Sequence, residues 1–323
     1  MNITGVSHHT LAALPGTPGK AAVSLSISSP YIDLNNFSTS LEHKGLHTEN
    51  NIKTKYSKID HILENETINI YLNAKRIIWK KLTSTNLNAH IELNAGNWNL
   101  QTLSMNLGRG NIQLSTKIIT QKSNKILSAS YSLNKIRAEE LLYSLDNFNL
   151  KGISHKNIRA ELSMNGTLVS RLNNKGVINP SEIKANILFE LKDGALLNYE
   201  PLLKIQEHVF KKRHLDSLKF ATIKNSIEIN NGNIHIPRME VATSALNVFV
   251  GGDYALNGNT NLHIQVPLNN ITRRDQTKKM SMASNKEKGG ASVFLRAVSE
   301  ENGQVKLKLD PNGGKYKREQ LAQ

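Results

Sequence analysis

The strongest candidates for chemistry in this sequence are four cations in a polar run at 272–290: Arg273, Arg274, Lys278 and Lys279. Guanidinium and ammonium groups bind phosphate through charge-assisted hydrogen bonds, and clustered cations attract anionic lipid head groups. The run has almost no apolar periodicity, which is typical of a loop. We interpret it either as a contact for a polyanion or lipid head group or as a solvated loop.

The other polar motifs do not form a catalytic or metal site. The Gly-Arg-Gly run at 108–110 lacks the rest of a dinucleotide fingerprint and is typical of a turn. Glu139 and Glu140 are neighbours on a short predicted helix and point in different directions, which favours solvated carboxylates over an acid and base pair. The histidine pair at 8–9 lies in a predicted flexible lead, and the chain has no cysteine to ligate a metal. We therefore predict a protein that is not an enzyme and uses no cofactor or metal.

The formal net charge of +15 favours acidic partners without choosing among them. Much of the excess charge is lysine on the polar faces of predicted strands, where it also discourages edge-to-edge aggregation. The eight Tyr, seven Phe and two Trp are thinly scattered, so no aromatic platform for stacking bases is predicted. We expect no nucleic-acid partner.

Short strands with alternating aliphatic residues dominate the chain, and Asn/Gly turns separate them. Two such turns lie at 94–97 and 108–111. This spacing is typical of a meandering antiparallel structure. The alternation of apolar and polar residues along each strand favours a sheet with one face exposed to solvent. A short helix is predicted over 136–145, where Leu141, Leu142 and Leu145 have near-helical spacing. The predicted fold class is mainly β, an elongated, curved antiparallel sheet with one or two short helices.

The stretch 181–250 contains the clearest strand patterns. We predict that the first strand stops at 192–194, that a helix at 200–213 begins at Pro201, and that 230–233 forms a tight turn. Pro237 lacks an amide hydrogen and should interrupt the ladder. The residues assigned to one apolar face of this region are Ile183, Ile187, Phe189, Ile227, Ile229, Ile234, Ile236, Val248, Leu262 and Ile264. They are candidates for a groove lining or for ordinary core.

Four segments are predicted from these patterns. Residues 1–20 contain several Gly and Pro and are predicted to be a flexible lead. Residues 21–148 form a strand-rich repetitive β region, and 149–310 form a C-terminal β domain that includes the helix near 200–213. Residues 311–323 are predicted to be a polar tail. No apolar run approaches the ~18 residues of a membrane-spanning helix, and the amino end does not have the pattern of a signal peptide.

Three motifs in the C-terminal half resemble the C-terminal domain of AsmA-like proteins. They are LKDGALLNYEPL at 191–202, LKFATIKNSIEINNGNIHIPRMEVATSAL at 218–246 and GGDY at 251–254. The resemblance extends over about 149–310, and the motifs occur in order at a spacing compatible with the family. It implies a long, curved β-sheet whose concave face is an apolar groove, in a protein of bacterial envelope biogenesis.

The resemblance also implies a function without a catalytic residue. AsmA-like proteins are thought to guide phospholipid tails between the inner and outer membranes, so a phospholipid or other envelope lipid and the membranes or their proteins are the expected partners. The expected location is the periplasmic face of the bacterial inner membrane, with the family's N-terminal anchor helix upstream of this chain or lost. The alternative is a scaffold that regulates the assembly or targeting of proteins to the outer membrane by protein contact.

Overall fold

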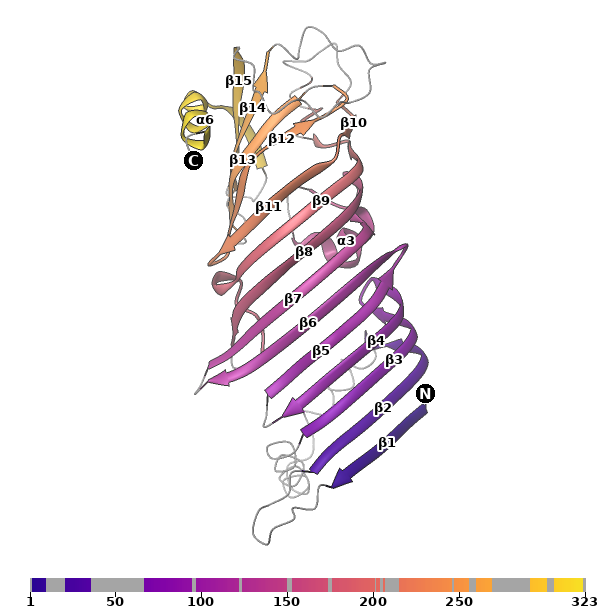
Figure 1. Ribbon diagram of the computed structural model, residues 1–323. Helices are drawn as coiled ribbons and strands as arrows, with labels where there is room; N and C mark the ends of the chain where they lie inside the picture. Colours follow the sequence, from indigo (N-terminus) through magenta and orange to yellow (C-terminus); the bar gives the residue numbers. More distant parts are fainter. Residues whose placement is uncertain are drawn as a thin grey trace. The chain divides into compact units, whose positions relative to one another are not determined.

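The part of the chain that the structure describes is mostly β-strand (Figure 1). The computed structural model describes residues 2–9, 21–35, 67–94, 97–121, 124–149, 153–173, 176–200, 202–203, 206, 215–245, 247–255, 260–268, 291–300 and 305–321. The strands are β1 (Asn2–His9), β2 (Ala21–Asp33), β3 (Thr67–Trp79), β4 (Leu82–Asn94), β5 (Asn97–Leu107), β6 (Gly110–Gln121), β7 (Asn124–Arg137), β8 (Ile158–Leu172), β9 (Lys184–Leu197), β10 (Ser217–Phe220), β11 (Ile223–Asn230), β12 (Asn233–Ala242), β13 (Asn247–Ala255), β14 (Thr260–Pro267), β15 (Ser292–Ser299) and β16 (Val305–Leu309).

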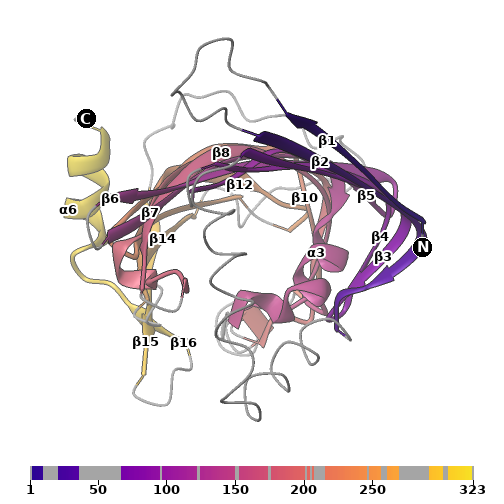
Figure 2. The ribbon, with the colours of Figure 1, turned by 90° about the horizontal axis from the view of Figure 1, so that it is seen from below.

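Two α-helices are described in full, α3 (Ala138–Ser144) and α6 (Gly313–Leu321), together with the short 3₁₀ turns η1 (Asp146–Asn149) and η2 (Pro180–Glu182). Figure 2 shows α3 and α6 on opposite sides of the strands next to them. The helix predicted over 136–145 is confirmed by α3. The helix predicted over 200–213 lies mostly outside the described residues.

The strands form one open sheet in which neighbours in space are neighbours in the chain. The order runs from β1 to β9 and continues from β11 to β16, while the short β10 pairs with β9. The described pairings are antiparallel except for β2 and β3, which are parallel. A parallel pair needs a long connection, and 34–66 supplies it. The prediction of a mainly β fold built on an antiparallel sheet is confirmed.

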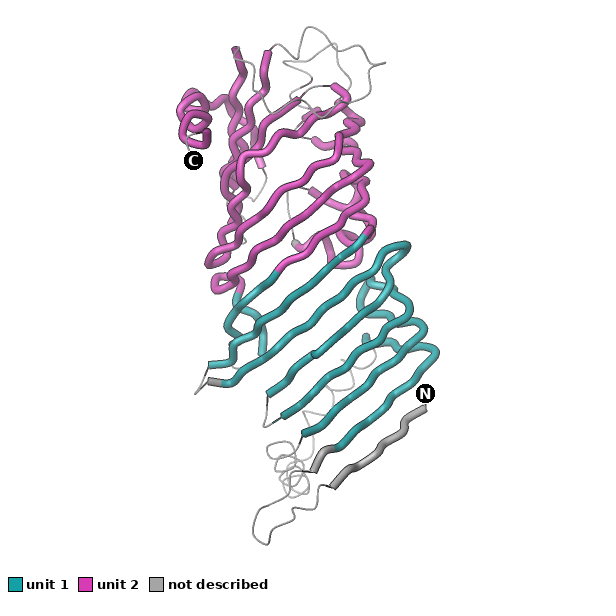
Figure 3. Tube along the Cα trace, in the orientation of Figure 1, with its two compact units in different colours: residues 1–134, 167–179 teal, residues 135–166, 180–323 magenta. Residues whose placement is uncertain are grey.

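The chain divides into two compact units (Figure 3). Unit 1 contains 1–134 and 167–179, and unit 2 contains 135–166 and 180–323. The boundary that the sequence predicts at 148/149 stays a prediction. Each unit is described separately below.

The predicted turns form because asparagine and glycine tolerate a positive φ. Between β11 and β12, Asn231 and Gly232 have φ angles of 51° and 76°, and the flanking residues Asn230 and Asn233 pair with each other. This is the backbone of the two-residue hairpin turn that best matches the strand twist. Between β5 and β6, Gly108 has a φ of 57°. Both turn predictions are confirmed.

The prediction for the amino end is wrong over residues 2–9, and the polar carboxyl end contains a helix that the sequence analysis did not predict. Residues 2–9 were expected to be part of a flexible lead, but they form β1, which pairs with β2 along its whole length. The rest of that lead lies outside the described residues. The polar tail contains α6, which begins at Gly313 against Phe294 and places Tyr316 on His263. In both cases a tertiary contact supplies the order that the local sequence does not predict.

Strand β9 does not stop at 192–194, contrary to the prediction. It continues to Leu197, with a φ of 47° at Asp193. A Cβ at Gly194 would lie 1.8 Å from Cε2 of Phe220 on β10, so the absence of a side chain lets the Phe220 ring pack against β9. The glycine is therefore a packing site within the strand, not a strand end.

Pro237 also lies inside a strand. The register between β12 and β13 shifts between Ile236 and Met239, which places Pro237 in a bulge where its missing amide breaks no regular pair. The carbonyl of Pro237 accepts a hydrogen bond of 3.1 Å from the Asn225 side chain. The predicted interruption of the ladder is confirmed as a bulge, and the strand continues beyond it.

Candidate functional site

One face of unit 1 is apolar across six strands. Residues directly opposite each other in neighbouring strands place their side chains on the same face, so the register identifies the members of that face. One row contains Ile27, Leu72, Ala89, Leu103, Leu114 and Tyr131, from β2 to β7 in order. A second row contains Leu25, Ile70, Ile91, Leu100, Thr116 and Ala129. Every strand from β2 to β7 therefore contributes aliphatic side chains to this face.

Most of this face is only half-buried. Ile70, Leu72, Ile91, Leu103 and Leu114 all keep part of their surface exposed. A fully covered face of a β-sandwich would bury them. The exposed fraction is therefore an apolar surface that remains in contact with solvent.

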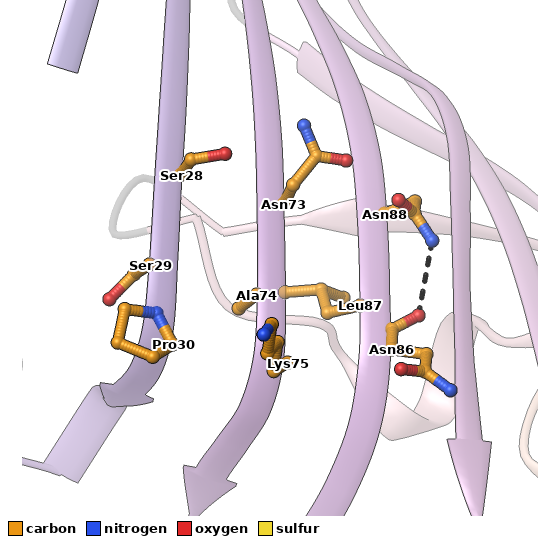
Figure 4. A pocket seen from close by; sticks show the side chains of 9 residues that line it. All are labelled: Ser28, Ser29, Pro30, Asn73, Ala74, Lys75, Asn86, Leu87 and Asn88. Carbon is orange, nitrogen blue, oxygen red and sulfur yellow. Dashed lines mark hydrogen bonds between the residues drawn. The ribbon is translucent and has the colours of Figure 1, made fainter. Parts of the chain in front are cut away.

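Two hollows are lined by residues of both faces of the unit 1 sheet. One hollow has a volume of about 470 Å³, and Ala74 and Leu87 lie side by side in it (Figure 4). These two residues are also members of a buried cluster with Ile77, against which Leu72, Leu103 and others pack. Serine, asparagine, proline and lysine residues of β2, β3 and β4 complete the lining: Ser28, Ser29, Pro30, Asn73, Lys75, Asn86 and Asn88. The hollow thus combines apolar and hydrogen-bonding groups.

The second hollow has a volume of about 520 Å³ and lies over β5, β6 and β7. Leu103, Leu114 and Tyr131 line it, and all three belong to the first apolar row. Burial raises the pKa of the Tyr131 hydroxyl, which indicates a site where a charged group is poorly solvated. Polar residues of the same three strands complete the lining: Gln101, Thr102, Ser104, Gln113, Ser115, Ser130 and Ser132.

The opposite face of unit 1 carries hydroxyl and amide groups. The register places Ser28, Asn73, Asn88, Ser104, Gln113 and Ser132 in one row across β2 to β7. Beside this row, His90 stacks on Tyr71 with ring centroids 4.4 Å apart, and its Nε2 lies 3.0 Å from Oδ1 of Asn69. This face is suited to solvent.

Unit 2 repeats the same division into an apolar and a polar face. On β9 and β11, Ile187 is opposite Ile227; Ile229 is opposite Ile234 of β12. One long row contains Ile236, Gly252, Leu262, Ala297 and Leu307, from β12 to β16 in order. Together with strand alternation, this register places Phe189, Val248 and Ile264 on the same face as well. Among the candidate apolar residues only Ile183 lies outside the strands; its amide donates to the Pro180 carbonyl.

Other elements cover part of the unit 2 apolar face. Phe189 packs against a buried cluster that includes Ala138 of α3 and Phe220 of β10. Val248 and Ile264 pack against a second buried cluster at Leu215, Leu218 and Val266. These three candidates are half-buried and pack against the core of unit 2. The members of the face that are half-buried and belong to neither cluster are Ile187, Ile227, Ile229, Ile234, Ile236 and Leu262.

The polar face of unit 2 is charged, and α6 lies on it. His263 Nδ1 is 2.8 Å from Oδ2 of the buried Asp310, and the His263 ring stacks on Tyr316 with centroids 3.8 Å apart. Arg238 donates to Gln265 at 2.7 Å and lies over the Phe249 ring. Burial raises the pKa of Tyr316, and nearby Asp253 raises it further while Arg238 lowers it. The cluster anchors the C-terminal helix to the sheet.

The four cations of the 272–290 run, Arg273, Arg274, Lys278 and Lys279, lie outside the described residues, so their proposed contact with head groups stays a prediction. Within the described residues no group of three metal-ligating side chains forms. Among those residues there is also no helix with the length and apolar character needed to cross a bilayer. No protein-family model, curated protein or solved structure matches the chain.

Sequence reasoning missed two features of the site. The hollow at Ala74 and Leu87 depends on contacts among β2, β3 and β4 that no local pattern reports. The pair formed by His263 and Asp310 joins residues far apart in the chain. Alternation alone could have placed Leu103, Leu114 and Tyr131 on one face of unit 1, but not on one row.

Proposed function

We propose that this protein binds phospholipid tails on its apolar sheet faces and guides them between the membranes of a bacterial envelope. The observation that carries the proposal is the register of unit 1, which gathers aliphatic side chains from six consecutive strands on one face and leaves most of them only partly buried. The resemblance to AsmA-like proteins supports the same function. The periplasmic face of the inner membrane is the proposed location.

The chemistry of such a surface requires no catalytic group. Each methylene removed from water contributes about 0.8 kcal/mol, so an acyl chain of ordinary length gains enough from partial burial to remain on the face. The lipid phosphate stays solvated. A row of equivalent aliphatic contacts lets a tail move without a large barrier.

The experiment compares two neighbouring positions on β6 that have opposite faces. Leu114→Asp places a carboxylate on the apolar face, while Gln113→Asp places the same charge on the polar face and serves as the matched control. Native mass spectrometry and lipid extraction measure bound phospholipid, and circular dichroism checks the fold. We expect phospholipid on the wild type and on Gln113→Asp, and a loss of most of it from Leu114→Asp.

A folded wild-type chain that carries no phospholipid, and takes none up from vesicles, would contradict the proposal. Equal loss of lipid from both variants would also contradict it, because the effect would then follow charge and not the apolar face. The first result would favour the alternative, a scaffold for proteins of the outer membrane that acts by protein contact alone.

A further inference from the structure

The last strand of the sheet, β16, leaves one edge unpaired among the described residues. It pairs with β15 on one side through a regular antiparallel register from Val305 to Leu309. Edge strands usually avoid further pairing by being short or by means of a proline, a bulge or charged side chains. β16 has five residues and two lysines, Lys306 and Lys308, but neither a proline nor a bulge, so its backbone can pair only with a segment that accommodates these charges.

The apolar face of unit 2 continues to this edge. Leu307 is opposite Ala297, and Leu309 is opposite Leu295, so both leucines belong to the apolar face. Leu309 is 77% exposed, the largest exposed fraction among the bulky hydrophobic residues of the described chain. An aliphatic side chain on an added strand would cover it.

The polar side of the same edge is strongly basic. Lys308 lies directly opposite Arg296, and both side chains are exposed. Like charges directly opposite each other in a sheet destabilise the pair. Lys306 lies on the same side, where it forms an ion pair of 3.0 Å with Glu300. A carboxylate on an added strand would relieve the repulsion between Lys308 and Arg296.

The end of β16 is held in place by Asp310. The backbone amide of Asp310 donates to the Phe294 carbonyl at 2.9 Å, and its carboxylate accepts from the Asn312 amide at 3.1 Å and lies 2.8 Å from His263. The strand edge is therefore preorganised, which lowers the entropy cost of pairing another strand.

We infer that β16 is a docking edge for an extended segment of another protein in which aliphatic residues alternate with Asp or Glu. The backbone of the segment continues the hydrogen-bond ladder beyond β16. Its aliphatic side chains cover Leu307 and Leu309, and its carboxylates lie beside Lys306, Lys308 and Arg296. The inference is independent of lipid binding, because it concerns the edge and not the face.

The test uses the full chain and fluorescently labelled peptides longer than β16. One peptide alternates Val with Glu, a second alternates Val with Lys, and a third is the Val/Glu peptide with N-methylated backbone amides. Fluorescence anisotropy measures binding. The wild type should bind the Val/Glu peptide. It should bind the Val/Lys peptide and the N-methylated peptide about tenfold more weakly or not at all.

Charge reversal provides the decisive variant. Lys306→Glu/Lys308→Glu should lose affinity for the Val/Glu peptide and gain affinity for the Val/Lys peptide. Lys117→Glu/Lys125→Glu is the matched control, because both lysines are exposed on β6 and β7 of unit 1, which are separated from β16 by several strands in the sheet order. It should bind all peptides like the wild type.

Equal binding of the Val/Glu and Val/Lys peptides, or unchanged binding by Lys306→Glu/Lys308→Glu, would overturn the inference. So would tight binding of the N-methylated peptide, because pairing through the ladder would then be absent. Light scattering on the peptide-free protein tests whether a second copy of the chain occupies the edge instead. A dimer that Lys306→Glu/Lys308→Glu dissociates would show that a second copy of the chain occupies the edge, and would overturn the proposed partner.

Discussion

The two units build their apolar faces in the same way and differ in what covers them. In unit 1, Leu103 and Leu114 remain partly exposed in a row of aliphatic residues, beside the buried Ala74 and Leu87. In unit 2, α3, β10 and the residues around Leu215 bury part of the equivalent face. Alternation thus decides which side chains share a face, whereas covering elements decide whether that face is core or surface.

The polar faces of the two units also differ. The polar row of unit 1 is neutral, with serine, asparagine and glutamine in succession. Unit 2 has ion pairs on its polar face, and Glu190 lies 2.8 Å from Lys224 and 3.1 Å from Lys192. These two lysines lower the pKa of Glu190. Solvent is the natural partner of the unit 1 polar face, whereas unit 2 uses the face to hold α6.

The largest expected effect is the difference in unfolding free energy lost when a fully buried and a partly exposed aliphatic side chain are truncated. Leu215→Ala removes a side chain that is 1% exposed, so unit 2 should lose ~2–5 kcal/mol of unfolding free energy. Leu114→Ala in unit 1 should cost about 1 kcal/mol, because the side chain is only partly withdrawn from water. Urea unfolding, with hydrogen exchange to locate the change, measures both. A similar loss of unfolding free energy in the two variants would contradict the distinction between the two faces.

The next effect concerns the packing of β10 on β9 in unit 2. Gly194→Ala places a methyl group against the Phe220 ring and should destabilise the protein by about 1–3 kcal/mol. Adding Phe220→Leu should recover part of this loss, because the smaller side chain leaves room for the methyl group. Urea unfolding of the single and double variants measures the coupling. If the change in unfolding free energy of the double variant equals the sum of the two single changes, the contact with Phe220 does not limit the size of residue 194.

The smallest expected effect distinguishes two tyrosines by the cause of their raised pKa. Burial alone raises the pKa of Tyr131 in unit 1, while Asp253 adds to burial at Tyr316 in unit 2. Asp253→Asn should therefore lower the pKa of Tyr316 and leave that of Tyr131 unchanged. Ultraviolet titration of tyrosinate, with Tyr131→Phe and Tyr316→Phe to assign the signals, measures the shifts.

The same two groups predict a direction for alkaline stability. A pKa raised above the unfolded value of 10.0 means that the folded state binds the proton more tightly. The stabilising contribution is complete below pH 10 and is lost as the pH rises through the folded pKa. Tyr316→Phe should reduce the alkaline loss of α6 contacts, measured by hydrogen exchange. An unchanged alkaline profile in that variant would contradict the role of Tyr316.

Sequence patterns by themselves determined the strands, their faces and several turns. Ile187, Ile229 and Leu262 could be assigned to one face because side chains alternate along a strand with a period of two. The turn at Asn231 and Gly232 was predictable because those residue types tolerate positive φ. These are local properties of the backbone.

Only the tertiary structure decided which apolar residues pack against the core and which terminal segments form a strand or a helix. Phe189 and Ile264 have the same pattern as Ile229, yet they pack against buried residues distant in the chain. Strand β1 and helix α6 form through contacts with β2 and with His263, which no local propensity reports. The physical reason is that burial depends on long-range packing, whereas alternation depends only on the geometry of one strand.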